Sequence, residues 1–255
     1  MMDSAVLLDA RGISKHFLGV SALTDVDLTI NTSELVGLIG PNGSGKTTFF
    51  NCISGLLKQD KGSVEFRGAD ITNMRPDLIA RKGIRRTFQD IHNFANMTVL
   101  DNLLIAIQQQ QEDSIWQRAI RSQRVRHFEQ VAHERAKEVL EMVGLAHKAR
   151  QFANELSYGQ RKLLEFGAAL MPDPALILLD EPTAAVSAQM IKQMKELILN
   201  LHQHGKSFLI VEHNMKFIMD ISERIVVLDY GQKIAEGTPK EVQTDARVLE
   251  AYFGR

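Results

Sequence analysis

The stretch that decides the fold covers residues 40–47 and reads Gly40-Pro41-Asn42-Gly43-Ser44-Gly45-Lys46-Thr47. A short, apolar, β-prone segment at 34–39 precedes it, and residues 45–57 have a helical pattern, so a strand–loop–helix unit is predicted. Glycines let such a loop turn successive backbone N–H groups inward, toward the oxygens of a phosphate chain. The start of the helix adds partial positive charge. The stretch therefore predicts a P-loop that binds ATP or another nucleoside triphosphate.

Two side chains of this loop carry chemistry. Lys46 supplies a mobile ammonium for the β and γ phosphates, and the Thr47 hydroxyl is placed to bind Mg²⁺. Thr48 joins residues 40–47 in the expected nucleotide-binding set. A glycine-rich turn that matches by chance is disfavoured, because the required strand and helix flank the loop.

A second acidic motif follows an apolar run at 176–179. The run predicts a buried strand, and Asp180 and Glu181 come at its C-terminal end, the edge at which open α/β sheets bind ligands. Asp180 is expected to hold Mg²⁺ through water, and Glu181 to orient and deprotonate the attacking water. An acidic turn after a strand is common by itself, but the P-loop upstream favours the functional interpretation.

The remainder of the chain alternates between strand-like and helix-like segments. Further strands are expected near residues 6–13, 22–30, 63–66, 175–180, 207–212 and 224–229, and further helices at 188–202 and 215–221. This alternation predicts a parallel sheet with helices on its faces. Residues 97–153 are rich in Gln, Arg, Glu and Ala, so a mostly helical insert is expected there.

Composition and charge exclude several classes of protein. The net charge of −1 gives no bulk attraction to nucleic acid or anionic lipid, so no nucleic-acid partner is expected. No run approaches the roughly 18 consecutive apolar residues of a membrane span, so another chain must cross any membrane at which this one works. Cys52 is the single cysteine and cannot form an intrachain disulfide. Residues 1–10 lack the basic start of a signal peptide.

Further short motifs give the sequence a specific resemblance. The run Leu156-Ser157-Tyr158-Gly159-Gln160 resembles the LSGGQ signature of ATP-binding cassette (ABC) proteins and precedes the acidic strand, as in that family. Gln89 resembles the family's Q-loop glutamine, His213 its switch histidine, and Phe17 the aromatic residue that stacks on adenine. These elements stand in the family's order, and the resemblance covers nearly the whole chain.

The resemblance implies the fold. An ABC cassette is an α/β protein with a P-loop NTPase (RecA-like) parallel-sheet core, an antiparallel β subdomain and an inserted helical subdomain. The chain, 1–255, is then a single ABC ATPase domain, with a core lobe at 1–95 and 155–255 and the helical insert at about 96–154.

The resemblance also implies roles for individual residues. Gln89 would complete the Mg²⁺ sphere and sense the γ-phosphate, and His213 would hydrogen-bond that phosphate and hold the attacking water. Ser157, Gly159 and Gln160 would close over ATP on a second cassette, because cassettes of this family meet head to tail. The expected catalytic residues are Lys46, Gln89, Glu181 and His213, and the expected metal ligands are Thr47, Gln89 and Asp180.

Each of these residues also has a plain structural interpretation. Ser157 is a good helix N-cap whether or not it meets a phosphate, and Phe17 can belong to the core. His213 at a strand end and Gln89 in a loop are ordinary positions for such residues, and their place in the family's order is what favours function. Ser187 stands where the family's D-loop usually has Asp or Asn, which bears on coupling between paired active sites rather than on ATP binding.

Within the family, the chain resembles the ATP-binding subunits of branched-chain-amino-acid-type importers. The resemblance is carried by residues 86–104, 211–225 and 236–254. It implies an ATP-hydrolysing motor subunit, peripheral at the cytoplasmic face of the inner membrane, for a branched-chain amino acid or a related amino acid, amide or urea solute. The implied partners are two membrane-spanning permease subunits, a second ABC subunit, identical or paralogous, and a solute-binding protein.

Two other classes of function stay open at this point. A soluble ABC ATPase of DNA repair or translation would carry the same motifs, but usually with a long coiled coil, a zinc hook or a second cassette. A regulatory nucleotide sensor would require a damaged Glu181 or His213, and both are intact. Solute specificity lies in the permease and the binding protein, so this chain predicts only the class of solute.

Overall fold

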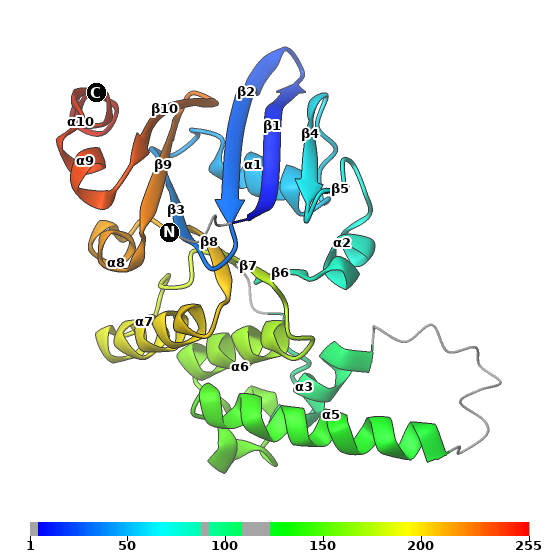
Figure 1. Ribbon diagram of the computed structural model, residues 1–255. Coiled ribbons are helices and arrows are strands. Elements are labelled where there is room, and N and C mark those ends of the chain that lie inside the picture. The colour runs from blue at the N-terminus through cyan, green and yellow to red at the C-terminus, as the bar shows by residue number, and fades with distance from the viewer. Residues whose placement is uncertain (1–4, 88–91, 109–122, 255) are drawn as a thin grey trace. The chain divides into compact units, whose positions relative to one another are not determined.

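The computed structural model describes residues 5–87, 92–108 and 123–254 (Figure 1). The described chain forms two compact units. The first unit takes its described residues from 1–86, 175–184 and 198–255, and the second from 87–174 and 185–197. The P-loop, the acidic motif and His213 belong to the first unit, and the signature-like run belongs to the second.

The first unit is built on a six-stranded sheet that is parallel except at one edge. In spatial order its strands are β10 (Gln232–Gly237), β9 (Arg224–Asp229), β3 (Leu35–Ile39), β8 (Ser207–Val211), β7 (Leu176–Asp180) and β6 (Ile84–Arg86). Every residue of β3, β7 and β8 is buried, as in central strands that are covered on both faces. Because these strands are parallel, the P-loop, Glu181 and His213 follow them at one edge of the sheet.

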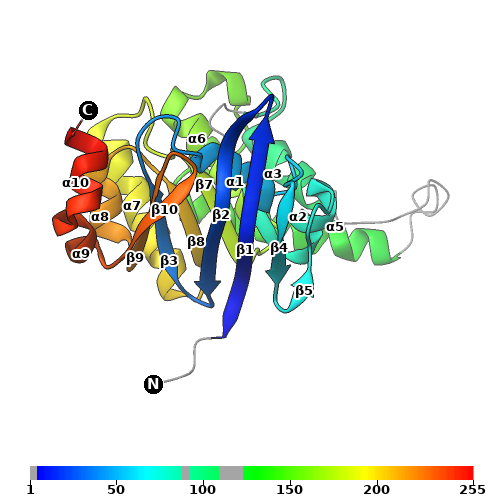
Figure 2. The ribbon, with the colours of Figure 1, turned by 90° about the horizontal axis from the view of Figure 1, so that it is seen from above.

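A second, antiparallel sheet of four strands lies in the same unit (Figure 2). Its spatial order is β2 (Val20–Asn31), β1 (Val6–Phe17), β4 (Lys61–Phe66) and β5 (Ala69–Asp70). In β2 the residues from Val26 to Ile30 alternate between buried and exposed, which is the period of a strand with one face on the core.

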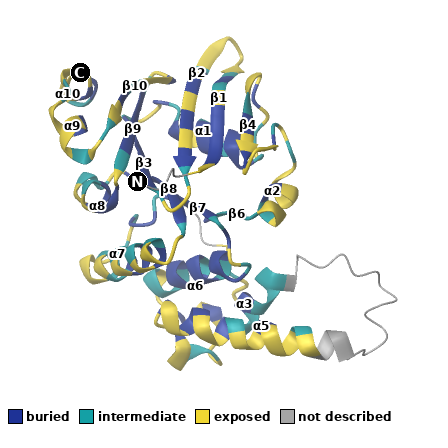
Figure 3. Ribbon diagram, viewed as in Figure 1, coloured by how far each residue is buried: buried dark blue, intermediate teal, exposed yellow. Residues whose placement is uncertain are grey.

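Helix α1 (Lys46–Ile53) shares its core with both sheets. Phe49 and Phe50 are fully buried, in one apolar cluster with Leu8 of β1 and Leu38 of β3. The ribbon of α1 is mostly coloured as buried (Figure 3). Burial also raises the pKa of Cys52 to about 11, so this thiol is protonated at neutral pH. The helix that follows the P-loop is therefore fixed by packing, and the loop has a rigid end.

Shorter helices complete the first unit. They are α2 (Pro76–Lys82), α8 (Met215–Ile221), α9 (Pro239–Thr244), α10 (Ala246–Phe253) and the last residues of α7 (Ala188–Gln203). Asn214 caps α8 by accepting the Phe217 N–H. Helix α8 contacts β3, where a Cβ on Gly37 would lie 2.8 Å from Cγ1 of Ile218.

The second unit is helical. It contains α3 (Val99–Gln108), α5 (Gln123–Met142), α6 (Tyr158–Leu170), the first part of α7, and 3₁₀ turns at Ala146–Lys148 and Ala153–Glu155. Gly167 of α6 allows close packing, since a Cβ there would lie 3.2 Å from Val139 and 3.4 Å from Leu103. Among the residues that the structure describes, no helix is long and apolar enough to cross a membrane.

The structure confirms the predicted fold class, with a parallel core sheet, an antiparallel sheet and a helical middle. Helix α8 and strand β9 have the predicted bounds. The helix predicted to reach residue 57 ends at Ile53, because the backbone of Gly55 has a left-handed φ of +74° that a helix cannot continue through. A side chain at residue 55 would also clash with the Met74 carbonyl. The second compact unit includes α6. The sequence-based division, with a helical insert at about 96–154, instead places α6 in the core lobe. That division stays a prediction about domain organisation.

Candidate nucleotide-binding site

The P-loop joins β3 to α1 and packs closely on its neighbours. Gly40 and Gly45 adopt φ angles of +153° and +102°. A Cβ on Gly40 would lie 2.1 Å from the Leu228 carbonyl oxygen, and a Cβ on Gly45 would lie 2.7 Å from that of Ala22. Glycine is therefore required at both positions by backbone conformation and by contact.

We expect Gly40→Ala to destabilise the fold by about 3 kcal/mol and to abolish nucleotide binding, because the loop must move away from Leu228. The matched control is Gly43→Ala, where no atom lies within 4 Å of a built Cβ and only the φ of +79° is strained, at about 1 kcal/mol. Urea unfolding and titration with a fluorescent ADP analogue measure both effects. Equal losses in the two variants would contradict this account of the loop.

Lys46 lies buried inside the loop. Its Nζ donates hydrogen bonds to the carbonyl oxygens of Gly40 and Pro41, both at 2.8 Å. Burial lowers the pKa of Lys46 from its ordinary value, and the carboxylates of Glu181 and Asp180 oppose that shift by favouring the ammonium. The ammonium is thus held within reach of any phosphate that the loop's N–H groups bind.

A cavity of about 240 Å³ opens beside this loop. It is lined by Ala22, Asn42, Gly43, Ser44, Gly45, Lys46, Thr47, Thr48, Glu181 and His213. The lining therefore combines the P-loop with residues that follow β7 and β8. Most of the predicted nucleotide set, with one carboxylate and one imidazole of the predicted catalytic set, faces a single cavity of phosphate-binding character.

Glu181 and His213 contact each other at this cavity. Their Oε1 and Nε2 atoms are 2.8 Å apart, and the side chains are 21% and 46% exposed, so water reaches the pair. Glu181 has a φ of +48°, which is unusual for a residue with a side chain. Such strain persists where the surroundings fix the backbone, and it is common at functional sites.

Asp180, the last residue of β7, makes an ion pair that the sequence did not predict. Its Oδ2 lies 2.6 Å from Nη2 of Arg86, and both side chains are less than a tenth exposed. Nη1 of Arg86 also donates to Asn51 and Ser54 at the end of α1, at 2.7 and 3.0 Å. The guanidinium therefore joins β6, β7 and α1 behind the P-loop.

Arg86→Met should destabilise the protein by about 3 to 5 kcal/mol, because the carboxylate of Asp180 would stay buried without its cation. The double variant Arg86→Met/Asp180→Asn should recover part of that loss, since it also removes the buried negative charge. Urea unfolding at pH 7 tests this. A loss below about 1 kcal/mol in the single variant would show that the pair is not a structural requirement.

The oxygen donors at the site fit Mg²⁺. Thr47 lines the cavity, whereas Asp180 is not among the lining residues, precedes Glu181 and pairs with Arg86. A hydroxyl and a carboxylate are hard ligands, and Mg²⁺ usually takes one or two carboxylates, substrate phosphates and water. In the described ranges no group of three or more His, Cys, Asp and Glu is gathered for a metal. Gln89, the third predicted ligand, lies outside the described residues.

The signature-like run begins helix α6 in the second unit. Ser157 is the N-cap: its Oγ accepts the Gln160 N–H at 3.3 Å, while Gln160 Oε1 accepts the Ser157 N–H at 3.0 Å. Ser157 is exposed, and a Cβ on Gly159 would lie 2.9 Å from Met190. The structural interpretation of Ser157 as a cap is therefore confirmed, and it leaves the exposed N-terminus of α6 able to meet an anion.

Phe17 ends β1 and is not a core residue. It is 45% exposed, and the Lys15 ammonium lies 5.6 Å from its ring centroid. The alternative that Phe17 is a core residue is therefore wrong. Its ring is accessible, as stacking on adenine requires, and that stacking stays a prediction.

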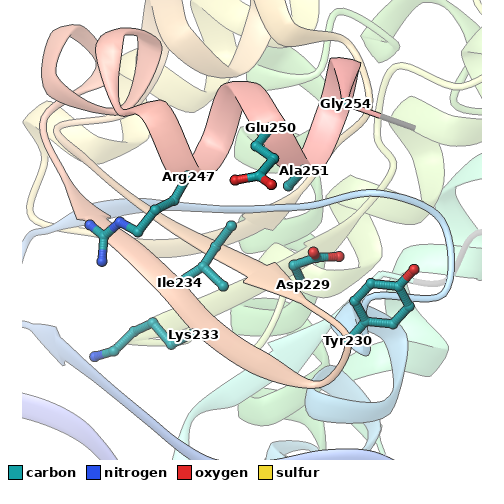
Figure 4. A pocket seen from close by; sticks show the side chains of 8 residues that line it. All are labelled: Asp229, Tyr230, Lys233, Ile234, Arg247, Glu250, Ala251 and Gly254. Atoms are coloured by element: carbon teal, nitrogen blue, oxygen red, sulfur yellow. The ribbon is translucent and has the colours of Figure 1, made fainter.

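A second cavity, of about 460 Å³, lies between the β9–β10 hairpin and α10 (Figure 4). Its cations already have anionic partners: Arg247 pairs with Asp245 at 2.6 Å and Lys233 with Glu236 at 2.7 Å. Burial raises the pKa of Tyr252 in α10 to about 12, and the backbone of Gly40 opposes this shift.

The sequence of this chain is similar to those of known proteins. Residues 23–184 match the family model described as ABC transporter, and residues 232–255 match that of the branched-chain amino acid ATP-binding cassette transporter. The high-affinity branched-chain amino acid transport ATP-binding protein LivG of Escherichia coli (strain K12) is 37% identical over 252 residues, which are 98% of this chain and 99% of LivG.

Solved structures share the fold over nearly the whole chain. The crystal structure of the ADP conformation of MJ1267, an ATP-binding cassette of an ABC transporter, has a TM-score of 0.85 and 36% identity, covering 99% of this chain and 100% of that one. The dimeric structure of the ATP-binding cassette MJ0796 bound to ADP and Pi has a TM-score of 0.76 and 26% identity, covering 91% and 99%. Family model, relatives and structures agree: the chain belongs to the ABC transporter family and is one of its ATP-hydrolysing ATP-binding cassettes.

Proposed function

We propose that this cassette is the motor subunit of an importer for branched-chain amino acids or a related amino acid, amide or urea solute. Two similarities support the solute class: LivG is a high-affinity branched-chain amino acid transport ATP-binding protein, and residues 232–255 match the branched-chain amino acid cassettes. The observation that carries the catalytic part is the convergence of the P-loop, Glu181 and His213 on one cavity.

ATP binding begins with an exchange of partners at Lys46. Its Nζ leaves the carbonyl oxygens of Gly40 and Pro41 and binds oxygens of the β and γ phosphates, while the loop's N–H groups bind the rest of the chain. The exposed ring of Phe17 stacks on adenine. Thr47, Asp180 and Gln89 would hold Mg²⁺, which neutralises phosphate charge when bound.

Hydrolysis then uses the pair at the mouth of the cavity. The Glu181 carboxylate accepts a proton from water as that water attacks the γ-phosphorus, and His213 hydrogen-bonds the γ-phosphate. The bond from the γ-phosphorus to the oxygen shared with the β-phosphate breaks, so ADP and inorganic phosphate are the products. The 2.8 Å contact between the two side chains fixes the imidazole beside the base. Lys46 stabilises the negative charge that remains on the transferred group.

A second cassette completes the site. Ser157, Gly159 and Gln160 at the N-terminus of α6 would close over the γ-phosphate bound by the partner cassette, where N–H groups and the helix dipole favour an anion. The related cassette MJ0796 has a dimeric structure with ADP and Pi bound, which supports a pair of cassettes. Ser187 stands where the family usually has Asp or Asn, at a position that bears on coupling between the paired sites.

The remaining partners follow from the importer role. Two permease subunits would cross the membrane, a solute-binding protein would deliver the solute, and the cassettes would lie at the cytoplasmic face of the inner membrane. The chain's relatives are named as transport ATP-binding proteins, which supports this placement.

Purification of the tagged chain with its native membrane complex tests the proposal. We expect permease subunits and a second cassette to purify with the chain. The purified complex should also show ATP-dependent uptake of labelled leucine or of another solute in this class. Purification of the chain with nucleic acid or ribosomes, and without permeases, would overturn the importer role in favour of a soluble ABC ATPase.

A further inference from the structure

Glu212 is a buried carboxylate without a role in the chemistry described above. It is 3% exposed and lies between the end of β8 and His213. Its Oε1 accepts the Thr183 N–H at 2.7 Å, and its Oε2 accepts the N–H groups of His213 and Asn214, each at 2.9 Å. One side chain thus binds the loop that follows Glu181 and the loop that carries His213.

These hydrogen bonds lie next to the strained residue of the site. The Glu181 N–H donates to the Val211 carbonyl at 2.9 Å, which continues the β7–β8 ladder. Two residues later, the Thr183 N–H is held by Glu212. The backbone of Glu181, with its φ of +48°, is therefore fixed on both sides.

A carboxylate is the side chain that suits this position. Its two oxygens accept several hydrogen bonds at once, whereas an amide offers one acceptor and directs its NH₂ group at a donor. Bonds from N–H groups to a buried carboxylate are charge-assisted and strong. Helix capping does not account for Glu212, because Asn214 already caps α8 through the Phe217 N–H at 3.1 Å.

We infer that Glu212 is a positioning residue for ATP hydrolysis. Its hydrogen bonds hold the loops of Glu181 and His213 so that the two side chains stay in contact at 2.8 Å. The inference rests on the roles proposed for these two side chains. Glu212 touches neither ATP nor water in this account, and it acts through the backbone of the two loops.

The test is steady-state ATPase, with Mg-ATP, of the full-length chain purified in its native membrane complex. Glu212→Gln should lower kcat by about 10-fold or more while KM for ATP changes by less than about 2-fold, because the P-loop is untouched. Glu212→Asp keeps the charge but reaches less far, so its kcat should lie between those of the wild type and Glu212→Gln. Wild-type kcat in both variants would overturn the inference.

A double-mutant cycle separates positioning from general loss of structure. If Glu212 acts through the two loops, Glu212→Gln should cost less than about 3-fold in kcat when His213 is already replaced by Ala. The same loss on both backgrounds would overturn the inference. If His213→Ala and Glu181→Gln themselves keep wild-type turnover, the proposed roles of those residues fail, which is a different result.

Glu34→Gln is the matched control. Glu34 is also largely buried, holds the Asn31 N–H at 2.7 Å and pairs with Arg224, but it lies before β3, at the opposite end of the sheet. Glu34→Gln should lower the midpoint temperature of thermal unfolding and leave kcat per folded molecule unchanged. An equal fall in kcat for both variants would show that lost stability, and not lost positioning, explains Glu212→Gln.

Discussion

Glu181→Gln is expected to lower ATP turnover by about 10² to 10⁴-fold, because the amide cannot accept the proton of the attacking water. ATP binding should persist, since the P-loop that holds the phosphates is unchanged. The amide still hydrogen-bonds His213, so the 2.8 Å contact and the loop geometry are retained. Phosphate release from Mg-ATP and equilibrium binding of ATP measure the two halves of this prediction.

The control for Glu181→Gln is Glu34→Gln, which makes the same change of carboxylate to amide before β3, at the opposite end of the sheet from Glu181, and should keep wild-type turnover. If Glu181→Gln hydrolyses ATP within about 3-fold of the wild type, the carboxylate is not the general base. If turnover and ATP binding fall together, the variant has damaged the P-loop cavity rather than the chemical step.

Lys46→Ala is expected to weaken ATP binding by about 3 kcal/mol or more, which is a factor of at least about 100 in Kd. The phosphates lose their principal cation, and no other P-loop side chain carries a positive charge. Hydrolysis should fall with binding, since the same ammonium stabilises the transferred phosphoryl group. Isothermal titration with Mg-ATP gives the change in affinity.

Lys233→Ala is the control for that experiment. Lys233 pairs with Glu236 at the second cavity, so its loss removes one positive charge without touching the P-loop. ATP affinity in this control should stay within about 2-fold of the wild type, because distant surface charges are screened. Unchanged ATP affinity in Lys46→Ala would contradict the assignment of the P-loop as the phosphate site.

The sequence predicted the site well where local pattern decides position. The P-loop, Glu181 and His213 each follow an apolar strand, and parallel strands bring their carboxyl ends to one edge. In the structure, residues 42–48 of the P-loop region, Glu181 and His213 line one cavity. Their roles in binding and catalysis stay predictions, as does Gln89, which lies outside the described residues.

The sequence did not predict the supporting contacts, because these join distant parts of the chain. Arg86 pairs with Asp180, 94 positions away, and Glu212 binds Thr183, 29 positions away. Arg86 and Glu212 stand next to motifs recognised in the sequence. The available signal was a charged side chain within an apolar strand or directly after one. Such a residue must find a partner when it is buried.

The most direct test of the account is a crystal structure of Glu181→Gln with Mg-ATP. We expect ATP in the P-loop cavity, Lys46 Nζ moved from the Gly40 and Pro41 carbonyls to the β and γ phosphates, and His213 in contact with the γ-phosphate. We also expect Glu212 still to accept the Thr183 N–H. Nucleotide bound elsewhere, or Lys46 still on the two carbonyls with ATP present, would contradict it.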